Sequence, residues 1–207
     1  QKKYNLAIKF FETALRKSFF SNNLYNNLAI AYLNSFNFCK GLKYLNTGFQ
    51  KFINEEDLIT INFNDNDQLF FGINYCPNHT SEEIFSYYQQ FDNKFGLPLR
   101  KEWKPFTPIK KPKKKLRIGY VSPDFRNHSM KGFLKPVLAH HNHEHFEIYA
   151  FAELSKEDRV TKQYQSYVDQ WIPTQNLTDE QMAQKIRDLE IDILVDLAGH
   201  TKGNRLG

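Results

Sequence analysis

The sequence predicts a multidomain protein: all-α helical hairpins followed by an α/β unit with a parallel, Rossmann-like sheet. From Tyr4 to Lys51 there is no proline, and apolar residues recur three and four positions apart, which is the period of amphipathic helices. From Leu116 onward, short apolar runs alternate with helical patterns, which favours parallel strands joined by right-handed crossovers. A run of lysines separates the two patterns.

The helical part, residues 1–53, carries a repeat of 34 residues. Ala7, Phe11 and Ala14 are spaced four and three positions apart, and the same spacing recurs 34 residues later at Gly41, Leu45 and Gly48. The first helix of the repeat would contain Tyr25, Leu28, Ala29 and Tyr32. This period, with small residues where helices cross, is typical of tetratricopeptide repeats, and a plain helical hairpin is the alternative. Because such repeats bury their faces only against neighbours, we expect further repeats before Gln1, so that this chain is a fragment.

Residues 54–103 predict a helical connector. Thr80 and Glu83 have the spacing of a capping box. A stripe of apolar and aromatic residues follows at helical spacing and is interpreted as core packing: Ile84, Phe85, Tyr88, Phe91 and Phe95. We expect this helix to stop at Gly96-Leu97-Pro98.

The net charge of +5 comes from the run around residues 104–115. Seven of the 28 basic residues lie in the segment 104–117, which has no acid, and the remaining 21 are fewer than the 23 acidic residues. We therefore interpret 104–115 as a solvated basic linker, with phosphate binding or nuclear import as the alternative. Nucleic-acid binding by the whole chain is not supported.

Cys39 and Cys76 cannot form a disulfide framework, which favours a reducing compartment. No segment has the pattern of a secretion signal or of a membrane helix. These features predict a cytoplasmic protein.

Residues 116–207 predict the α/β unit. The expected strands are 116–121, 146–152, 170–173 and a strong buried strand at 191–198. The expected helices are 130–138, 157–168 and one that begins at a capping box formed by Thr178 and Gln181.

Two loops of this unit carry polar groups. One follows the first strand and contains Asp124, Asn127 and His128; the other follows the last strand as Gly199-His200-Thr201. Because the carboxyl ends of parallel strands share one edge, the two loops should meet there. Asp192 and Asp196 lie in the last expected strand. Asp192 and His200 are residues of a kind that orients a base or holds an acceptor, and the alternative for an acid within a strand is a pair with a neighbouring base.

Other chemistries lack their signatures. The sequence has no GxGxxG, P-loop or GxSxG motif, which removes the fingerprints of dinucleotide enzymes, NTPases and hydrolases. Four histidines crowd one helix end, but nothing fixes them around a metal, and we interpret them as a solvated turn: His140, His141, His143 and His145.

Several ordered motifs together resemble one family. RIGYVSPDFRNHS, the two histidines after the first helix, FEIYAFAE, DILVDLAGHTKGNRL and the connector NYCPNHTSEEIFSYYQQF look like the bacterial, SPINDLY-like members of the O-linked N-acetylglucosamine transferase family. The resemblance spans nearly the whole chain. It implies a tetratricopeptide superhelix joined to a two-Rossmann glycosyltransferase of the GT-B type, of which this chain would hold the first catalytic half.

The resemblance also implies the chemistry. A sugar, N-acetylglucosamine from UDP-GlcNAc, would pass with inversion to Ser or Thr of acceptor proteins that bind along the superhelix. His128 matches the histidine of the family motif and is the candidate general base. Acceptor- or donor-site loop residues would be Asp124, Asn127, Gly199, His200 and Thr201. No cofactor and no metal are expected, and the donor nucleotide would bind mainly to the half that is absent here.

Alternatives stay open. An O-fucosyltransferase using GDP-fucose fits the same motifs, because nothing in this half selects the sugar or the base. A non-catalytic tetratricopeptide scaffold for protein binding is a second class. A free-standing receiver-type domain would need an acid cluster at the first strand end, where only Asp124 stands.

Overall fold

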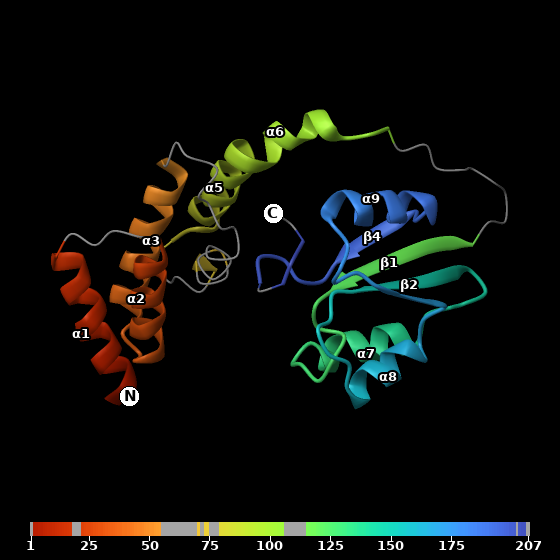
Figure 1. Cartoon of the computed structure of the whole chain (residues 1–207), viewed down its shortest axis with the longest axis horizontal. Coiled ribbons are helices and arrows are strands. Elements are labelled where there is room, and N and C mark those ends of the chain that lie inside the picture. Colours follow the sequence, from red (N-terminus) through yellow and green to blue (C-terminus); the bar gives the residue numbers. More distant parts are fainter. Residues whose placement is uncertain are drawn as a thin grey trace. The chain divides into compact units, whose positions relative to one another are not determined.

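The computed structural model describes residues 2–17, 22–54, 70, 73–74, 79–105, 115–201 and 203–205. The chain divides into two compact units, Gln1–Trp103 and Lys104–Leu206, whose elements are labelled in Figure 1. Most of the expected basic linker (106–114) and of the first part of the connector (55–69) lies outside the described residues. No helix of the described part is both long and apolar enough to span a bilayer.

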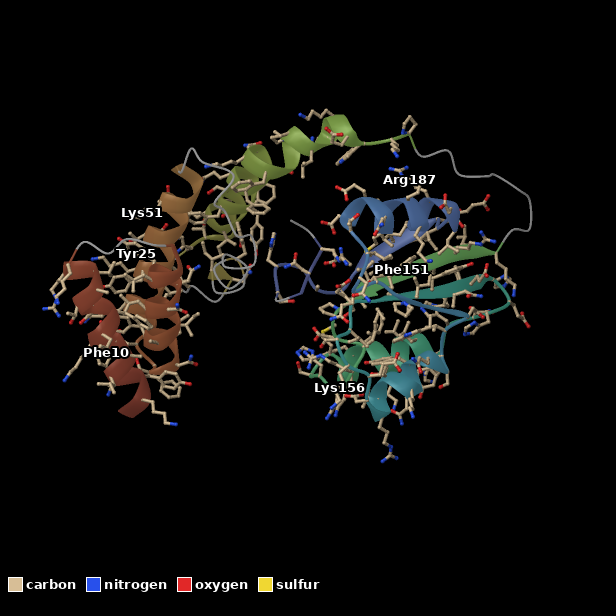
Figure 2. The ribbon with its side chains drawn as sticks, viewed as in Figure 1. Phe10, Tyr25, Lys51, Phe151, Lys156 and Arg187 are labelled. Atoms are coloured by element: carbon tan, nitrogen blue, oxygen red, sulfur yellow. The ribbon has the colours of Figure 1, made fainter. Side chains whose placement is uncertain are left out.

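The first unit begins with three helices: α1 (Lys2–Arg16), α2 (Asn22–Asn34) and α3 (Phe38–Asn54). Leu28 of α2 is fully buried and packs with Ile8 of α1. Phe10, labelled on α1 in Figure 2, is 67% exposed, so only one face of α1 contributes to this core.

Glycines set the separation of α2 and α3. A Cβ atom on Gly41 would lie 2.8 Å from Cγ of Leu33, and one on Gly48 would lie 3.0 Å from Cβ of Tyr25. Both distances are shorter than ordinary van der Waals contact, so alanine at either position would require its neighbour to shift. The expected role of these small residues is confirmed, while the assignment of the hairpin to a tetratricopeptide repeat stays a prediction.

The connector contains α5 (Ser81–Phe91), which begins as expected. Thr80 and Glu83 form a reciprocal capping box. Tyr87 is buried and its hydroxyl donates to Asn46 Oδ1 on α3 at 3.0 Å, whereas Phe85 is 60% exposed. Ile84, Tyr88 and Phe91 of the expected stripe pack against the core that includes Leu42 and Leu45 of α3. The core role expected for the stripe is confirmed for these three residues and is wrong for Phe85.

The expected stop at Gly96-Leu97-Pro98 is wrong. The chain continues through a π-helical turn, η2 (Asp92–Gly96), into α6 (Leu97–Leu99) and the 3₁₀ turn η3 (Arg100–Glu102). Pro98 lies at the start of α6, directly after the π-helical turn in which the Leu97 N–H donates to the Asp92 carbonyl, so the residue without an N–H follows a widened part of the helix.

The second unit is a four-stranded parallel sheet in the order β3-β2-β1-β4. Its strands are β1 (Leu116–Ser122), β2 (Phe146–Ala152), β3 (Gln170–Pro173) and β4 (Ile193–Asp196). Its helices are α7 (Lys131–Ala139), α8 (Arg159–Gln165) and α9 (Asp179–Asp188), the last opened by the expected Thr178–Gln181 capping box.

Helices cover both faces of the sheet: α7 and α8 lie on one side and α9 on the other (Figure 1). Under α7 and α8, the core includes Leu138, Ile148 and Tyr164. Phe151, labelled in Figure 2, belongs to the core that includes Met182 of α9. The sheet is thus buried as the alternating pattern predicted.

The last strand differs from expectation. β4 is shorter than the expected buried strand at 191–198, and Ile193 and Leu194 are 45% and 49% exposed. In the described part of the chain β4 pairs with β1 alone and so lies at the sheet edge. Ile191 and Ala198, just outside the strand, are the buried positions.

Candidate active site

The first loop, which follows β1, is a compact series of turns. The Asp124 N–H donates to Ser122 Oγ at 2.9 Å, the Arg126 N–H to the Asp124 carbonyl at 2.7 Å, and the His128 N–H to the Arg126 carbonyl at 2.8 Å. Phe125 is fully buried beneath the loop, edge-on to the rings of Tyr164 and Trp171. Local bonds and an apolar anchor therefore fix the loop that carries His128.

His128 lies beside Asp124. Its Nδ1 lies 3.5 Å from Asp124 Oδ2, and the side chain of His128 is 37% exposed while that of Asp124 is 11% exposed. Arg126 donates to the other oxygen, Asp124 Oδ1, at 3.0 Å. None of the described residues is recorded bonding to Nε2 of His128. The Met130 backbone nitrogen also lies 3.5 Å from Nδ1 and can donate to it when the ring proton sits on Nε2. In the other tautomer the proton on Nδ1 faces Asp124, and Nε2 can accept a proton.

Asn127 ties the first loop to α8. Its N–H donates to Asp158 Oδ2 at 2.7 Å, while Asp158 Oδ1 caps α8 by accepting from the N–H groups of Val160 and Thr161. The Asn127 N–H is the largest of the contributions that lower the pKa of Asp158. One carboxylate thus holds a loop and a helix end together.

The second loop, which follows β4, turns on Asp196 and Gly199. Asp196 Oδ2 accepts the Gly199 N–H at 2.6 Å, and Gly199 has a φ of 53°, in the left-handed region that favours glycine. Thr201 Oγ1 donates to the Ala198 carbonyl at 2.8 Å. Burial lowers the pKa of His200, and the charge of Asp196 acts in the opposite direction. His200 is therefore mainly neutral near pH 7.

The two loops meet at one edge of the sheet. β1 and β4 are parallel neighbours, and the Leu197 N–H donates to the Val121 carbonyl at 3.0 Å just beyond the pairing. A Cβ atom on Gly203 would lie 3.1 Å from Cβ of Pro123, so the chain just beyond the second loop packs directly against the first loop. The strand order also reverses between β1 and β4, and open α/β sheets bind ligands in the crevice at such a switch point.

Arg205, which the sequence analysis missed, fastens the chain beyond the second loop. Its Nε and one terminal nitrogen donate to Glu153 Oε2 at 3.0 and 2.8 Å, and that same terminal nitrogen donates to the carbonyls of Thr174 and Leu177. The other terminal nitrogen lies 2.6 Å from Asp179 Oδ1. Arg205 thereby joins the segment after β4 to the ends of β2 and β3. Only its place within the quoted GNRL motif could have drawn attention to it.

Asp192 does not belong to this edge. Its Oδ2 accepts the Arg117 N–H at 2.9 Å, and its own N–H donates to the Arg117 carbonyl. Arg117 lies near the start of β1, at the opposite end of the strands. Asp192 therefore aligns β4 with β1, and its suggested role beside His200 is wrong.

The histidine group also lies away from the loops. His141 Nε2 is 2.8 Å from the Tyr120 hydroxyl, and His143 Nδ1 is 3.0 Å from Asp169 Oδ2. Three or more His, Cys, Asp or Glu side chains arranged to hold a metal ion are not found within the described ranges.

Comparison with known proteins identifies the family. The model of glycosyl transferase family 41 matches residues 98–206, more than half of the chain. The chain belongs to glycosyl transferase family 41. The matched region contains both loops and the whole sheet, so the edge described above is part of a glycosyltransferase fold.

Relatives of this family 41 chain carry consistent names. A Solanum lycopersicum protein named "Probable UDP-N-acetylglucosamine--peptide N-acetylglucosaminyltransferase SPINDLY" is 28% identical over 66% of the chain and 15% of its own length. An Arabidopsis thaliana protein with the corresponding name ending in SEC is 34% identical over 55% of the chain and 12% of its own length.

Among solved structures, a K341M mutant of the Thermobaculum terrenum O-GlcNAc transferase superposes with a TM-score of 0.78 and 25% identity, over 98% of this chain and 38% of that one. The chain therefore spans less than one fifth of the curated relatives and about two fifths of the solved neighbour.

Proposed function

We propose that this chain supplies the tetratricopeptide end and the first Rossmann-like half of a GT-B protein O-glycosyltransferase. In this proposal residues 1–53 are repeat helices, 54–103 the connector, 104–115 a linker and 116–207 the catalytic half. The observation that carries it is the meeting of the His128 loop and the His200 loop at the switch point of a family 41 sheet. Support also comes from the relatives, which are named as peptide N-acetylglucosaminyltransferases.

The proposed reaction moves N-acetylglucosamine from UDP-GlcNAc to a Ser or Thr side chain of an acceptor protein with inversion. The hydroxyl oxygen attacks the anomeric carbon as the bond from that carbon to the diphosphate breaks. The hydroxyl proton passes to Nε2 of His128, and the nucleoside diphosphate leaves with the bonding electrons. Asp124 faces Nδ1 of the same ring at 3.5 Å and is proposed to keep the proton of the neutral imidazole on that nitrogen, which leaves Nε2 as the acceptor.

The other groups of the edge have positioning roles in this proposal. Asn127, Gly199 and Thr201 shape the two loops. Burial lowers the pKa of His200, so in this proposal its side chain adds no charge that would compete with the base. Residues outside this chain are proposed to hold most of the donor, and acceptor proteins are proposed to bind along the repeat helices. The reaction is proposed to need no metal, so a chelator should leave transfer unchanged.

Replacement of the base tests the mechanism. In the full-length protein, His128→Ala should reduce the transfer rate by about 100-fold or more at saturating acceptor, because proton transfer by a positioned base contributes on this scale. His145→Ala, at an exposed histidine outside both loops, is the matched control. Equal turnover in the two variants would contradict the role of His128.

The product identifies the sugar. Intact mass spectrometry of a co-expressed acceptor protein distinguishes an added N-acetylhexosamine from an added deoxyhexose. A deoxyhexose would replace the proposed donor by GDP-fucose, and no added sugar with either donor would leave a protein-binding scaffold.

A further inference from the structure

A shallow depression opens beside the first loop, between the start of α7 and the start of α8. Its volume is about 380 Å³, and its lining residues are Asn127, Lys131, Asp158, Arg159, Val160 and Gln163. Asn127 directly precedes His128, so the depression adjoins the proposed reaction site along the chain. None of the roles assigned above uses Lys131, Arg159 or Gln163.

Each side-chain acceptor of the lining already accepts a hydrogen bond. Asn127 Oδ1 accepts from Lys131 Nζ at 2.7 Å, and Gln163 Oε1 accepts from Lys135 Nζ at 2.9 Å. Asp158, whose carboxylate carries the negative charge of the lining, accepts the backbone N–H of Asn127 and those of its own capping box. Lys131 and Arg159 place two positive charges against this one, so the balance of charge in the lining favours an anion over a cation.

Hydrogen-bond donors, in contrast, remain available. The amide nitrogens of Asn127 and Gln163 are free to donate once their oxygens are engaged, and Lys131 has two further N–H groups. For Arg159, an exposed residue, no hydrogen bond or ion pair is recorded within the described part of the chain. The lining thus presents a guanidinium, an ammonium and two amide nitrogens around one space.

Such a donor set selects an anion with several acceptor oxygens. A guanidinium can bind a carboxylate or a phosphate through two parallel hydrogen bonds, and the nearby ammonium adds charge. The backbone N–H groups at the start of α8 contribute nothing, because Asp158 already accepts them. The attraction comes from the side chains of Lys131 and Arg159, and it acts against the one negative charge of Asp158.

We propose that this depression binds an acidic side chain of the acceptor protein, an aspartate, a glutamate or a phosphorylated residue, close to the Ser or Thr that receives the sugar. The inference rests on the proposed function and adds a sequence preference to it. An open, shallow site suits a side chain on a peptide that crosses the surface. The bond from Asn127 to Asp158 keeps the depression in a fixed relation to the His128 loop.

The test uses the full-length protein and a series of acceptor peptides that differ in one residue. At each position flanking the modified serine, one peptide carries Asp, one Asn and one phosphoserine. Dissociation constants are measured by fluorescence anisotropy without donor, and kcat/KM is measured with donor. The wild type should favour acidic over neutral peptide by about threefold to tenfold at one or two positions, the range of one charge-assisted contact at a solvent-open site. Comparison of Asp with phosphoserine identifies the anion.

Two variants and a control assign the preference to the depression. Arg159→Gln should abolish the preference, and Arg159→Glu should reverse it toward a peptide with Lys at the same position. Lys162→Gln removes the same charge from an exposed residue of α8 outside the lining and should leave the preference intact. Thermal unfolding of each variant checks that the exposed substitutions leave the fold unchanged.

Three results would overturn the inference. The first is no preference for an acidic residue at any flanking position, and the second is a preference that survives Arg159→Gln. The third is a rise in the KM for the donor that accounts for the whole loss of activity in Arg159→Gln. The third would instead make the depression a donor phosphate site. If no peptide is modified, the proposed function fails, and the anisotropy measurements still decide whether Arg159 confers binding of an acidic peptide.

Discussion

Arg205→Met removes one cation from the carboxyl edge of the sheet while preserving much of the side-chain volume. The side chains of Arg205 and Glu153 are only 18% and 16% exposed, and the Asp179 side chain is 64% exposed. Burial alone acts to lower the pKa of Arg205, yet its bonds to Asp179 and Glu153 raise that pKa overall. The guanidinium therefore remains charged and is held by its partners.

The expected loss follows from those exposures. Removing one member of a buried, hydrogen-bonded ion pair costs about 3–5 kcal/mol, and the exposure that remains here reduces this to about 2–3 kcal/mol. The Arg100–Asp92 pair supplies a contrast, since both side chains are 50% exposed and Arg100→Met should cost about 0–1 kcal/mol.

Amide hydrogen exchange of the full-length protein measures the local stability lost in Arg205→Met and in Arg100→Met. The method does not require a protein of more than one unit to unfold in a single two-state step. In Arg205→Met, amides of Gly199, Asn204 and Leu177 should exchange faster, because the segment after β4 loses its attachment. A double-mutant cycle that combines Arg205→Met with Glu153→Gln should give a coupling free energy between the two residues of about 1 kcal/mol or more. If Arg205→Met costs no more than Arg100→Met, the argument from burial is wrong.

Two further predictions concern the second loop. Burial lowers the pKa of His200 below its ordinary value of 6.5. Near and below that pH the unfolded state therefore binds more protons than the folded state, and stability falls as the solution is acidified. His200→Gln removes this group and should reduce the fall in melting temperature between about pH 7 and pH 5. An unchanged slope would contradict this. Gly203→Ala should destabilise the protein by about 1–2 kcal/mol, because φ at this position is 84° and the new Cβ would lie 3.1 Å from Cβ of Pro123. Gly132→Ala is the control: its new Cβ would meet nothing within 4 Å, and thermal unfolding should show a neutral or stabilising effect.

Local sequence signals predicted much of the fold because they act over a few residues. The capping boxes at Thr80 and Thr178 and the bounds of β2 and β3 follow from spacing and composition. The exposure of β4 did not, because a strand at a sheet edge and a central strand can share one apolar pattern. The sequence did not predict the helix beyond Pro98, because glycine and proline usually mark a helix end, whereas here a π-helical turn carries the helical path up to Pro98.

The candidate site was predictable only in outline. A parallel sheet requires the loops after its first and last strands to lie at one edge, and their histidines stand out in the sequence. The contacts that fix them involve residues far apart in the chain, such as Asp158 with Asn127 and Arg205 with Glu153. No local pattern encodes such pairs. Asp192 was misplaced for the same reason, since its end of the strand depends on where the pairing begins.

Asp158 carries a consequence for mutational mapping. Its carboxylate accepts hydrogen bonds from backbone N–H groups of both the first loop and α8, so its replacement would destabilise both segments at once. A scan scored by turnover would rank this carboxylate among the most sensitive positions, although it need never meet a reactant. Such a map would trace the scaffold of the edge as well as the groups that touch the sugar.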